Sequence, residues 1–223
     1  MKICVSNLCY KVKDKSGERN ILNYINYEFD YGKITTISGS SGSGKTTFLY
    51  ALAGILDINE GSVVVMDESI YDLSPIKRDM FRLQNMSLIY QNLNLLSFMS
   101  VEDNILLPFY LRNMSVDETV RNKIKEYMEI LGLGQVQKKS IDMLSGGEQQ
   151  RVSIIRAFIA NPRIILCDEP TGSLDRENTM KFMNSIKEMN KIEKTTVILV
   201  SHDEEVYSYG DRKIKMIDGN IVS

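Results

Sequence analysis

Cysteine, histidine and long apolar runs are scarce in this sequence of 223 residues. The three cysteines, Cys4, Cys9 and Cys167, form no CxxC pair. We therefore expect neither a disulfide framework nor a zinc site, and a reducing cytoplasm is the natural compartment. No run of about 18 apolar residues occurs, so no membrane-spanning helix is expected. The first residues also lack the apolar region and cleavage site of a signal peptide.

Positive and negative charges are nearly balanced, since the sequence has 27 Lys and Arg and 29 Asp and Glu, for a net charge of −2. Nothing in this balance demands nucleic acid or an anionic membrane surface as the main partner, and no nucleic acid is expected. With 43% apolar and 25% charged residues, the composition is that of an ordinary globular protein. At about 150 residues per domain, the length indicates one domain with room for a subdomain.

Apolar strand-like runs alternate with helical runs at both ends of the chain, whereas residues 76–133 are mainly helical. Near-continuous apolar strands between helices predict a parallel sheet that is covered on both faces. We therefore expect an α/β fold, a single domain over 1–223, with a helical subdomain at about 76–145. Strands are predicted at 33–38, 63–66, 163–168 and 195–200, helices at 46–56, 147–160 and 177–189, and a hairpin at Asp218-Gly219.

Residues 39–46, GSSGSGKT, match the phosphate-binding pattern GxxxxGK[ST] between a predicted strand and a predicted helix. Glycines let consecutive N–H groups turn toward an anion, and the helix directs its positive end to the same place. By itself the motif does not separate an ATPase from a GTPase or a small-molecule kinase. The predicted phosphate-binding residues are Gly39, Ser40, Ser41, Gly42, Ser43, Gly44, Lys45 and Thr46, with Thr46 also predicted to ligate Mg²⁺.

Asp168 and Glu169 lie at the carboxyl end of the predicted buried strand 163–168, where open parallel sheets bind ligands. We expect Asp168 to hold Mg²⁺ and Glu169 to act as the general base that polarises a water toward the γ-phosphate. A charged turn with no function after a strand would have the same sequence pattern. The phosphate-binding motif elsewhere in the chain favours the functional interpretation.

Residues 144–151, LSGGEQQR, place Ser145, Gly146 and Gly147 at the start of a predicted helix. Ser145 and Glu148 have capping-box spacing, so a purely structural cap is one interpretation. The paired glycines are poor helix formers and leave N–H groups bare at the positive end of the helix. This pattern favours a second phosphate site on the same chain.

LSGGEQQR resembles the signature of ATP-binding-cassette (ABC) ATPases, and the other elements of that family follow in order. Gln91 resembles the glutamine loop, Ser173-Leu174-Asp175 the loop after the catalytic glutamate, and His202 the switch histidine. The resemblance covers essentially the whole chain. It implies a P-loop NTPase core of the RecA type, with an antiparallel β region and an inserted α-helical subdomain.

The resemblance also implies a mechanism, in which two copies of the chain close head to tail over two ATP molecules. Ser145 and Gly147 of one copy would contact the γ-phosphate held by Gly39 to Thr47 of the other. Gln91 would sense Mg²⁺ and the attacking water, and His202 would hold the γ-phosphate and the water in place. Tyr10 is the candidate for stacking on adenine, although the family register also allows Val12, which has no aromatic face.

An ATPase of this family without a membrane span requires a separate transmembrane permease, and would lie on the inner face of the cell membrane. Residues 91–105 resemble ATPases of lipoprotein, macrolide and peptide exporters, which favours export of such a substrate. The alternatives are a membrane-associated ATPase that drives a signalling or division complex, and a soluble ABC ATPase acting on DNA or ribosomes. The 100 residues between Lys45 and Ser145 leave no room for a long coiled coil, and only one cassette is present.

Overall fold

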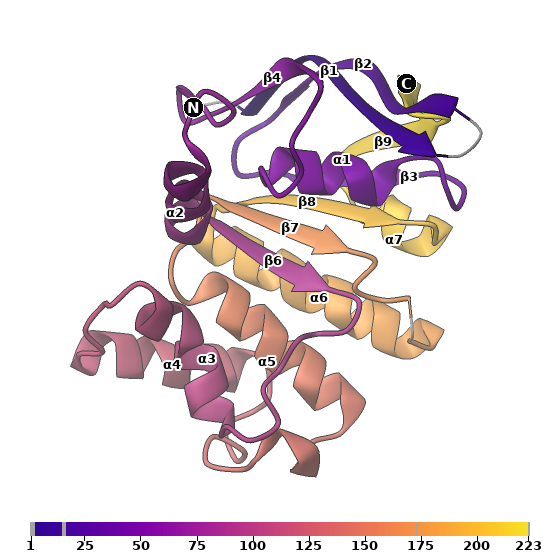
Figure 1. The fold of residues 1–223 in the computed structure, drawn as a ribbon. Helices are drawn as coiled ribbons and strands as arrows, with labels where there is room; N and C mark the ends of the chain where they lie inside the picture. Colours follow the sequence, from indigo (N-terminus) through magenta and orange to yellow (C-terminus); the bar gives the residue numbers. More distant parts are fainter. Residues whose placement is uncertain (1–2, 15–16, 173, 223) are drawn as a thin grey trace.

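The computed structural model describes residues 3–14, 17–172 and 174–222, and it has the α/β architecture that the sequence predicts. Two sheets lie on opposite sides of helix α1 (Figure 1). The smaller sheet is antiparallel, with strand order β2-β1-β4-β5, which confirms the expected antiparallel β region. Its strands are β1 (Ile3–Asp14), β2 (Gly17–Phe29), β4 (Glu60–Val65) and β5 (Glu68–Ser69).

The larger sheet has the order β10-β9-β3-β8-β7-β6, and its five strands β9, β3, β8, β7 and β6 run parallel. Strand β10 closes it through the hairpin at Asp218-Gly219, as predicted. Every residue of β3 and β8 is buried, as expected for a parallel sheet with both faces covered. The strands are β3 (Ile34–Ser38), β6 (Met86–Tyr90), β7 (Ile164–Asp168), β8 (Thr196–Ser201), β9 (Arg212–Ile217) and β10 (Asn220–Val222).

Two hydrophobic cores lie on the two faces of the larger sheet, because successive side chains of a strand point to opposite faces. Along β7, Ile164 and Leu166 join the core that contains α1 and the antiparallel sheet. Ile165 and Cys167 join the other core, which contains the helices drawn below the sheet in Figure 1. The helices are α1 (Lys45–Leu52), α2 (Pro75–Asn85), α3 (Val101–Leu111), α4 (Glu118–Ile130), the 3₁₀ turn η1 (Ile141–Met143), α5 (Gly146–Phe158), α6 (Arg176–Glu193) and α7 (Glu204–Ser208).

The middle of the chain departs from the prediction in one element. Residues 86–90, expected to be part of a helical region, form β6 and pair in parallel with β7. Their side chains alternate too briefly for the strand to stand out between two helices, and only the neighbouring strand fixes their conformation. Beyond β6, helices α3 and α4 pack with α5 on one side of the molecule (Figure 1).

The helix boundaries differ from the prediction by a few residues, most at the ends of α1 and α6, and α6 runs to Glu193 rather than to residue 189. Helix α1 ends at Leu52 rather than at residue 56, because Gly54 takes a left-handed φ of 64° that closes the helix. Helix α4 is capped by Asp117, whose side chain accepts a hydrogen bond from the Val120 amide at 2.9 Å. Within the described ranges, no helix combines the length and apolar character needed to cross a membrane.

Candidate nucleotide site

The phosphate-binding loop connects β3 to α1, as the motif predicts. Gly44 takes a φ of 97°, and a Cβ there would lie 2.9 Å from the Ile21 carbonyl oxygen of β2. At Gly39, a Cβ would lie 2.4 Å from the Met216 carbonyl oxygen. Since only glycine fits these two positions, the loop packs tightly against β2 and β9 while its N–H groups stay available to a ligand.

Lys45 lies at the mouth of this loop with only 5% of its surface exposed. Its ammonium donates hydrogen bonds to the carbonyl oxygens of Gly39 at 2.8 Å and Ser40 at 3.0 Å. The nearest carboxylate oxygen, from Glu169, is 3.9 Å away. A nearly buried cation held by neutral carbonyls is poised to take an anion, because a phosphate would replace part of the hydration that burial removes.

Thr46 and Asp168 come together at the carboxyl end of β7. The Thr46 hydroxyl donates to an Asp168 carboxylate oxygen at 2.8 Å. Burial, with the neighbouring Asp168 carboxylate, raises the pKa of Tyr50 to about 12, so this tyrosine stays protonated. Among the described residues no group of three or more His, Cys, Asp or Glu could hold a metal by itself. A hydroxyl beside one carboxylate instead suits Mg²⁺ bound together with phosphate oxygens.

Glu169 and His202 also meet at this edge, from the ends of β7 and β8. A carboxylate oxygen of Glu169 lies 2.6 Å from His202 Nδ1. Glu169 takes a φ of 44°, in the left-handed region that non-glycine residues avoid, and its amide donates to the Val200 carbonyl at 3.1 Å. This conformation turns the Glu169 side chain toward Lys45, and backbone strain of this kind gathers at functional sites.

Gln91 follows β6 and lies beside the turn after Glu169. A Cβ on Gly172 would be 3.0 Å from the Gln91 amide nitrogen, and the Gly172 amide donates to the Glu169 carbonyl at 3.0 Å. Gln91 also lines a hollow of about 560 Å³ with Gly146 and Gln149. The structure therefore places Gln91 between the Glu169 turn and the start of α5.

Ser145 caps α5 on the far side of that hollow. Its hydroxyl accepts from the Glu148 amide at 3.4 Å, and its own amide and hydroxyl each donate to the Glu148 carboxylate at 2.8 Å. These hydrogen bonds, first that of the side chain, lower the pKa of Glu148. Nothing lies within 4 Å of a Cβ built on Gly146, and Gly147 has only ordinary contacts. The capping box is therefore present, and Gly146 beside it faces open space.

A hollow of about 280 Å³ over the phosphate loop is lined by β2 as well as by the loop. The structure does not bring Tyr10 to it. Tyr10 pairs with Leu22 and packs against the core around α1. Sequence reasoning missed Arg19 and Ile21, which only the register of the β1–β2 hairpin could have indicated. The lining residues are Arg19, Ile21, Ser41, Gly42, Gly44, Lys45, Thr46, Thr47 and Glu169.

Two further parts of the predicted site are Ser43 and the segment Ser173-Leu174-Asp175. Ser43 is 1% exposed, and its hydroxyl has no hydrogen-bond partner in the described part of the chain. Ser173 falls outside the described residues. After it, Leu174 packs against the core around α5, and Asp175 caps α6 by accepting from the Asn178 amide at 2.8 Å.

Comparison with known proteins decides what this arrangement is. The sequence pattern of the family described as ABC transporter matches residues 22–172, about two thirds of the chain and most of the phosphate-binding edge. The chain belongs to the ABC transporter family. It is an ABC ATPase, an ATP-binding component of an ABC transporter, as the motifs predict.

Three relatives of this ABC ATPase have curated names. It is 36% identical to MG467 of Mycoplasma genitalium, named provisionally an ABC transporter ATP-binding protein, over 94% of this chain and 67% of that protein. It is 35% identical to the methionine import ATP-binding protein MetN of Clostridium tetani, over 93% and 64%. It is 33% identical to HrtA of Staphylococcus aureus, named provisionally a hemin import ATP-binding protein, over 99% of both. The chain thus spans about two thirds of the first two relatives.

Solved structures agree with this assignment. The dimeric bacterial ABC transporter cassette MJ0796 superposes with a TM-score of 0.86 at 30% identity, over 99% of this chain and 97% of that one. A second dimeric MJ0796 structure, of a post-hydrolysis state bound to ADP and phosphate, gives the same TM-score at 29% identity and the same coverage. The ABC ATPase described here therefore has the P-loop NTPase core that was predicted.

Proposed function

We propose that this ABC ATPase hydrolyses ATP at the phosphate loop and thereby powers a separate transmembrane permease that exports a peptide, lipoprotein or drug-like substrate. The meeting of Glu169 with His202, beside the contact of Thr46 with Asp168, carries the proposal of hydrolysis. The similarity of residues 91–105 to exporter ATPases supports the direction. The printed names of MetN and HrtA say import, so direction is the part of the proposal that most needs a test.

The proposed chemistry assigns one task to each group. The loop amides and Lys45 hold the triphosphate, and Glu169 accepts the proton of a water aimed at the γ-phosphate. His202, hydrogen bonded to Glu169, orients that carboxylate and contacts the γ-phosphate. Thr46, Asp168 and Gln91 would hold Mg²⁺, which would neutralise charge on the phosphate oxygens. Hydrolysis of ATP by the purified chain, lost in Glu169→Gln, tests this assignment, and equal phosphate release by the two proteins contradicts it.

We also propose that the chain acts as a homodimer, with residues 1–223 as a single ATPase domain. Ser145 and Gly147 flank Gly146, which lines the hollow beside Gln91, and no described contact joins them to the phosphate loop of the same chain. A second copy turned head to tail would supply the missing nucleotide. The dimeric MJ0796 cassettes, which share the fold over nearly the whole chain, support this arrangement.

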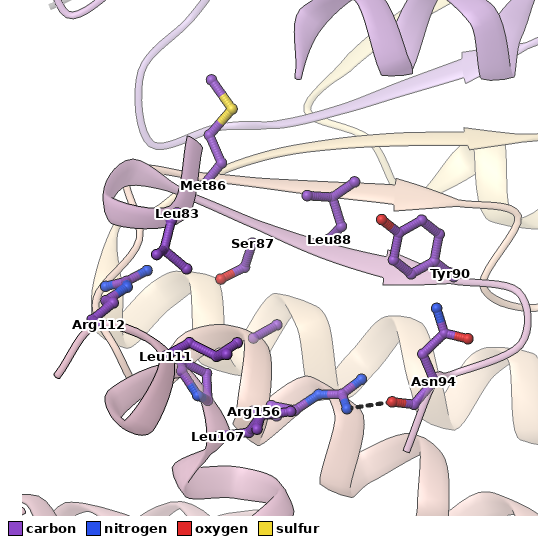
Figure 2. Close-up of a pocket in the computed structure, with 12 residues that line it drawn as sticks. Leu83, Met86, Ser87, Leu88, Tyr90, Asn94, Leu107, Leu111, Arg112 and Arg156 are labelled. Carbon is purple, nitrogen blue, oxygen red and sulfur yellow. Dashed lines mark hydrogen bonds between the residues drawn. The ribbon is translucent and has the colours of Figure 1, made fainter. Parts of the chain in front are cut away.

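The permease has a candidate docking surface in a groove of about 260 Å³ between β6 and α3 (Figure 2). Leu83, Leu107 and Leu111 line it. Ile76 and Met80 of α2 are exposed, and their spacing puts them on the same face of the helix as Leu83. This apolar surface suits a short helix of the permease that buries one face in the groove.

Two guanidinium groups in the same groove indicate what that helix carries. Arg156 donates to the carbonyl oxygens of Asn94, at 2.7 Å, and Leu93. Burial lowers the pKa of Arg156 to about 10 and also lowers the pKa of Arg112. Neither has a carboxylate partner within the described ranges, so an acidic side chain on the docking helix would complement them.

The direction of transport is tested with the permease that binds this surface. Tagged Glu169→Gln protein with ATP is used to isolate the permease from membranes, and Leu111→Glu serves as the variant with a damaged groove. The complex with wild-type chain is then placed in liposomes, with ATP outside. Uptake into liposomes whose ATPase faces outward supports export, whereas release of preloaded substrate supports import. ATP hydrolysis without flux of any substrate tried would favour a signalling complex.

A further inference from the structure

Part of the wall of the hollow of about 280 Å³ over the phosphate loop is made by β2. The Ile21 carbonyl approaches Gly44 closely, and a Cβ there would lie 2.9 Å from it. This contact fixes β2 against the phosphate loop, so Arg19 and Ile21 line the same hollow as Ser41, Gly42 and Thr47. A nucleotide whose phosphates lie in the loop must extend its ribose and base out of it. The side chains on β2 are positioned to meet them.

The register of the hairpin explains why an arginine, and no aromatic ring, stands at this wall. Val12 of β1 pairs with Arg19 of β2, and Tyr10 pairs with Leu22. Irregularities in the pairing flank Tyr10 on both sides. Leu22 is fully buried, and Tyr10 packs against the same core. The ring of Tyr10 is thus engaged in the hydrophobic core, and the other family position, Val12, has no flat face.

The Arg19 side chain is exposed and forms no hydrogen bond or ion pair among the residues that the structure describes. Its guanidinium is flat and weakly hydrated, and it stacks well on aromatic faces. We propose that Arg19 stacks on the adenine of bound ATP and takes the place of the aromatic residue at which the family resemblance placed that contact. Ile21 adds apolar contact beside it. The proposal rests on ATP binding at the phosphate loop.

Calorimetric titration tests the proposal with two ligands, ATP and inorganic tripolyphosphate, which shares the phosphates but has no base. The titrations use Glu169→Gln protein, so that ATP is not consumed. We expect Arg19→Ala to weaken ATP binding about five-fold and to leave tripolyphosphate binding unchanged, because the lost contact is with the base. Arg19→Tyr should restore ATP affinity. Arg19→Lys should not, because an ammonium keeps the charge without the flat surface.

Control variants separate this role from general effects on the hairpin. Lys13→Ala removes an exposed charge from the same hairpin outside the hollow, and it should change neither affinity. Tyr10→Leu should leave the ratio of ATP affinity to tripolyphosphate affinity unchanged, because the Tyr10 ring packs against the core and does not line the hollow. The ratio is compared because partial unfolding would lower both affinities equally.

Three results would overturn the proposal: unchanged ATP affinity in Arg19→Ala, an equal loss of tripolyphosphate affinity, or a lowered ratio in Tyr10→Leu alone. An equal loss of ATP and tripolyphosphate affinity in Arg19→Ala would mean that Arg19 binds the phosphates. A lower ratio of ATP to tripolyphosphate affinity in Tyr10→Leu would mean that Tyr10 contacts adenine. If the protein with Arg19 intact bound no ATP at all, the proposed function itself would fail, and that outcome is distinct from the other three.

Discussion

Two helices of this ABC ATPase, α1 and α5, have N-termini that we propose contact phosphate, and the residues at the two ends differ. Helix α1 follows Gly44, has no side-chain cap and has no acidic residue in its first turn. Helix α5 is capped by Ser145, and the Glu148 carboxylate of its first turn accepts a hydrogen bond from the Ser145 amide. Because a helix N-terminus carries partial positive charge, the end of α1 is left open for an anion, whereas the end of α5 already holds one.

The residues around the two helix ends also differ. Asp168 and Glu169 gather near the start of α1, together with His202. Beside the start of α5, Gly146 faces open space. We infer that the α1 end holds a nearly complete hydrolytic site, whereas the α5 end would recognise a nucleotide that is bound by a second copy of the chain.

Removing the proposed base near α1 should have the largest effect, on ATP turnover. In Glu169→Gln we expect ATP turnover to fall about 100-fold or more, because the amide cannot accept the proton of the attacking water. ATP affinity should persist, since Lys45 and the loop amides are untouched. Phosphate release and calorimetric titration measure the two quantities, and near wild-type turnover would count heavily against the assignment.

Removing the cation at the α1 end should have the next largest effect. Lys45→Ala should weaken ATP binding about 10- to 100-fold, because a charged hydrogen-bond donor to the phosphates is lost. Lys33→Ala is the matched control, since Lys33 is an exposed lysine at the opposite end of β3. Unchanged ATP affinity in Lys45→Ala, measured by titration, would refute the role of this lysine.

Removing the negative charge of Glu148 at the α5 end should change the stability of the ATP-dependent dimer. Glu148→Gln keeps a side chain that can hydrogen bond to Ser145 but removes the charge that would face a partner-bound phosphate. We expect the ATP-dependent dimer to become about two- to five-fold tighter. Sedimentation over a range of protein concentrations measures this, and a weaker dimer would mean that the carboxylate is needed for assembly.

The smallest effect expected is on stability at low pH. The folded-state pKa of Glu148 lies below its ordinary value of 4.5, so its charge stabilises the fold above about pH 4.5, and this contribution is lost as the pH falls through the lowered pKa. The contribution is small because the group is only partly buried and solvent screens its charge. The difference in urea midpoint between wild type and Glu148→Gln should therefore shrink from pH 6 to pH 3. A difference that stays constant over this range would contradict the assignment.

Local patterns in the sequence sufficed for the elements that carry chemistry. The loop at Gly39–Thr46, the acidic pair after β7 and the cap at Ser145 are each set by residues within a few positions of one another. Met86–Tyr90 was not predictable as a strand, because its conformation depends on pairing with β7, more than 70 residues away. The places of Tyr10 and Arg19 depend on hairpin register, which the irregular pairing around Tyr10 shifts.

The oligomeric state with ATP tests the central claim, that a second copy completes each nucleotide site. Sedimentation of Glu169→Gln protein should show a monomer with ADP and a dimer of twice that mass with saturating ATP. Adding Ser145→Arg to the same protein should keep it monomeric with ATP, while calorimetry shows that ATP still binds to the phosphate loop. A dimer that forms equally well with arginine at position 145, or a Glu169→Gln protein that stays monomeric when filled with ATP, would contradict the account.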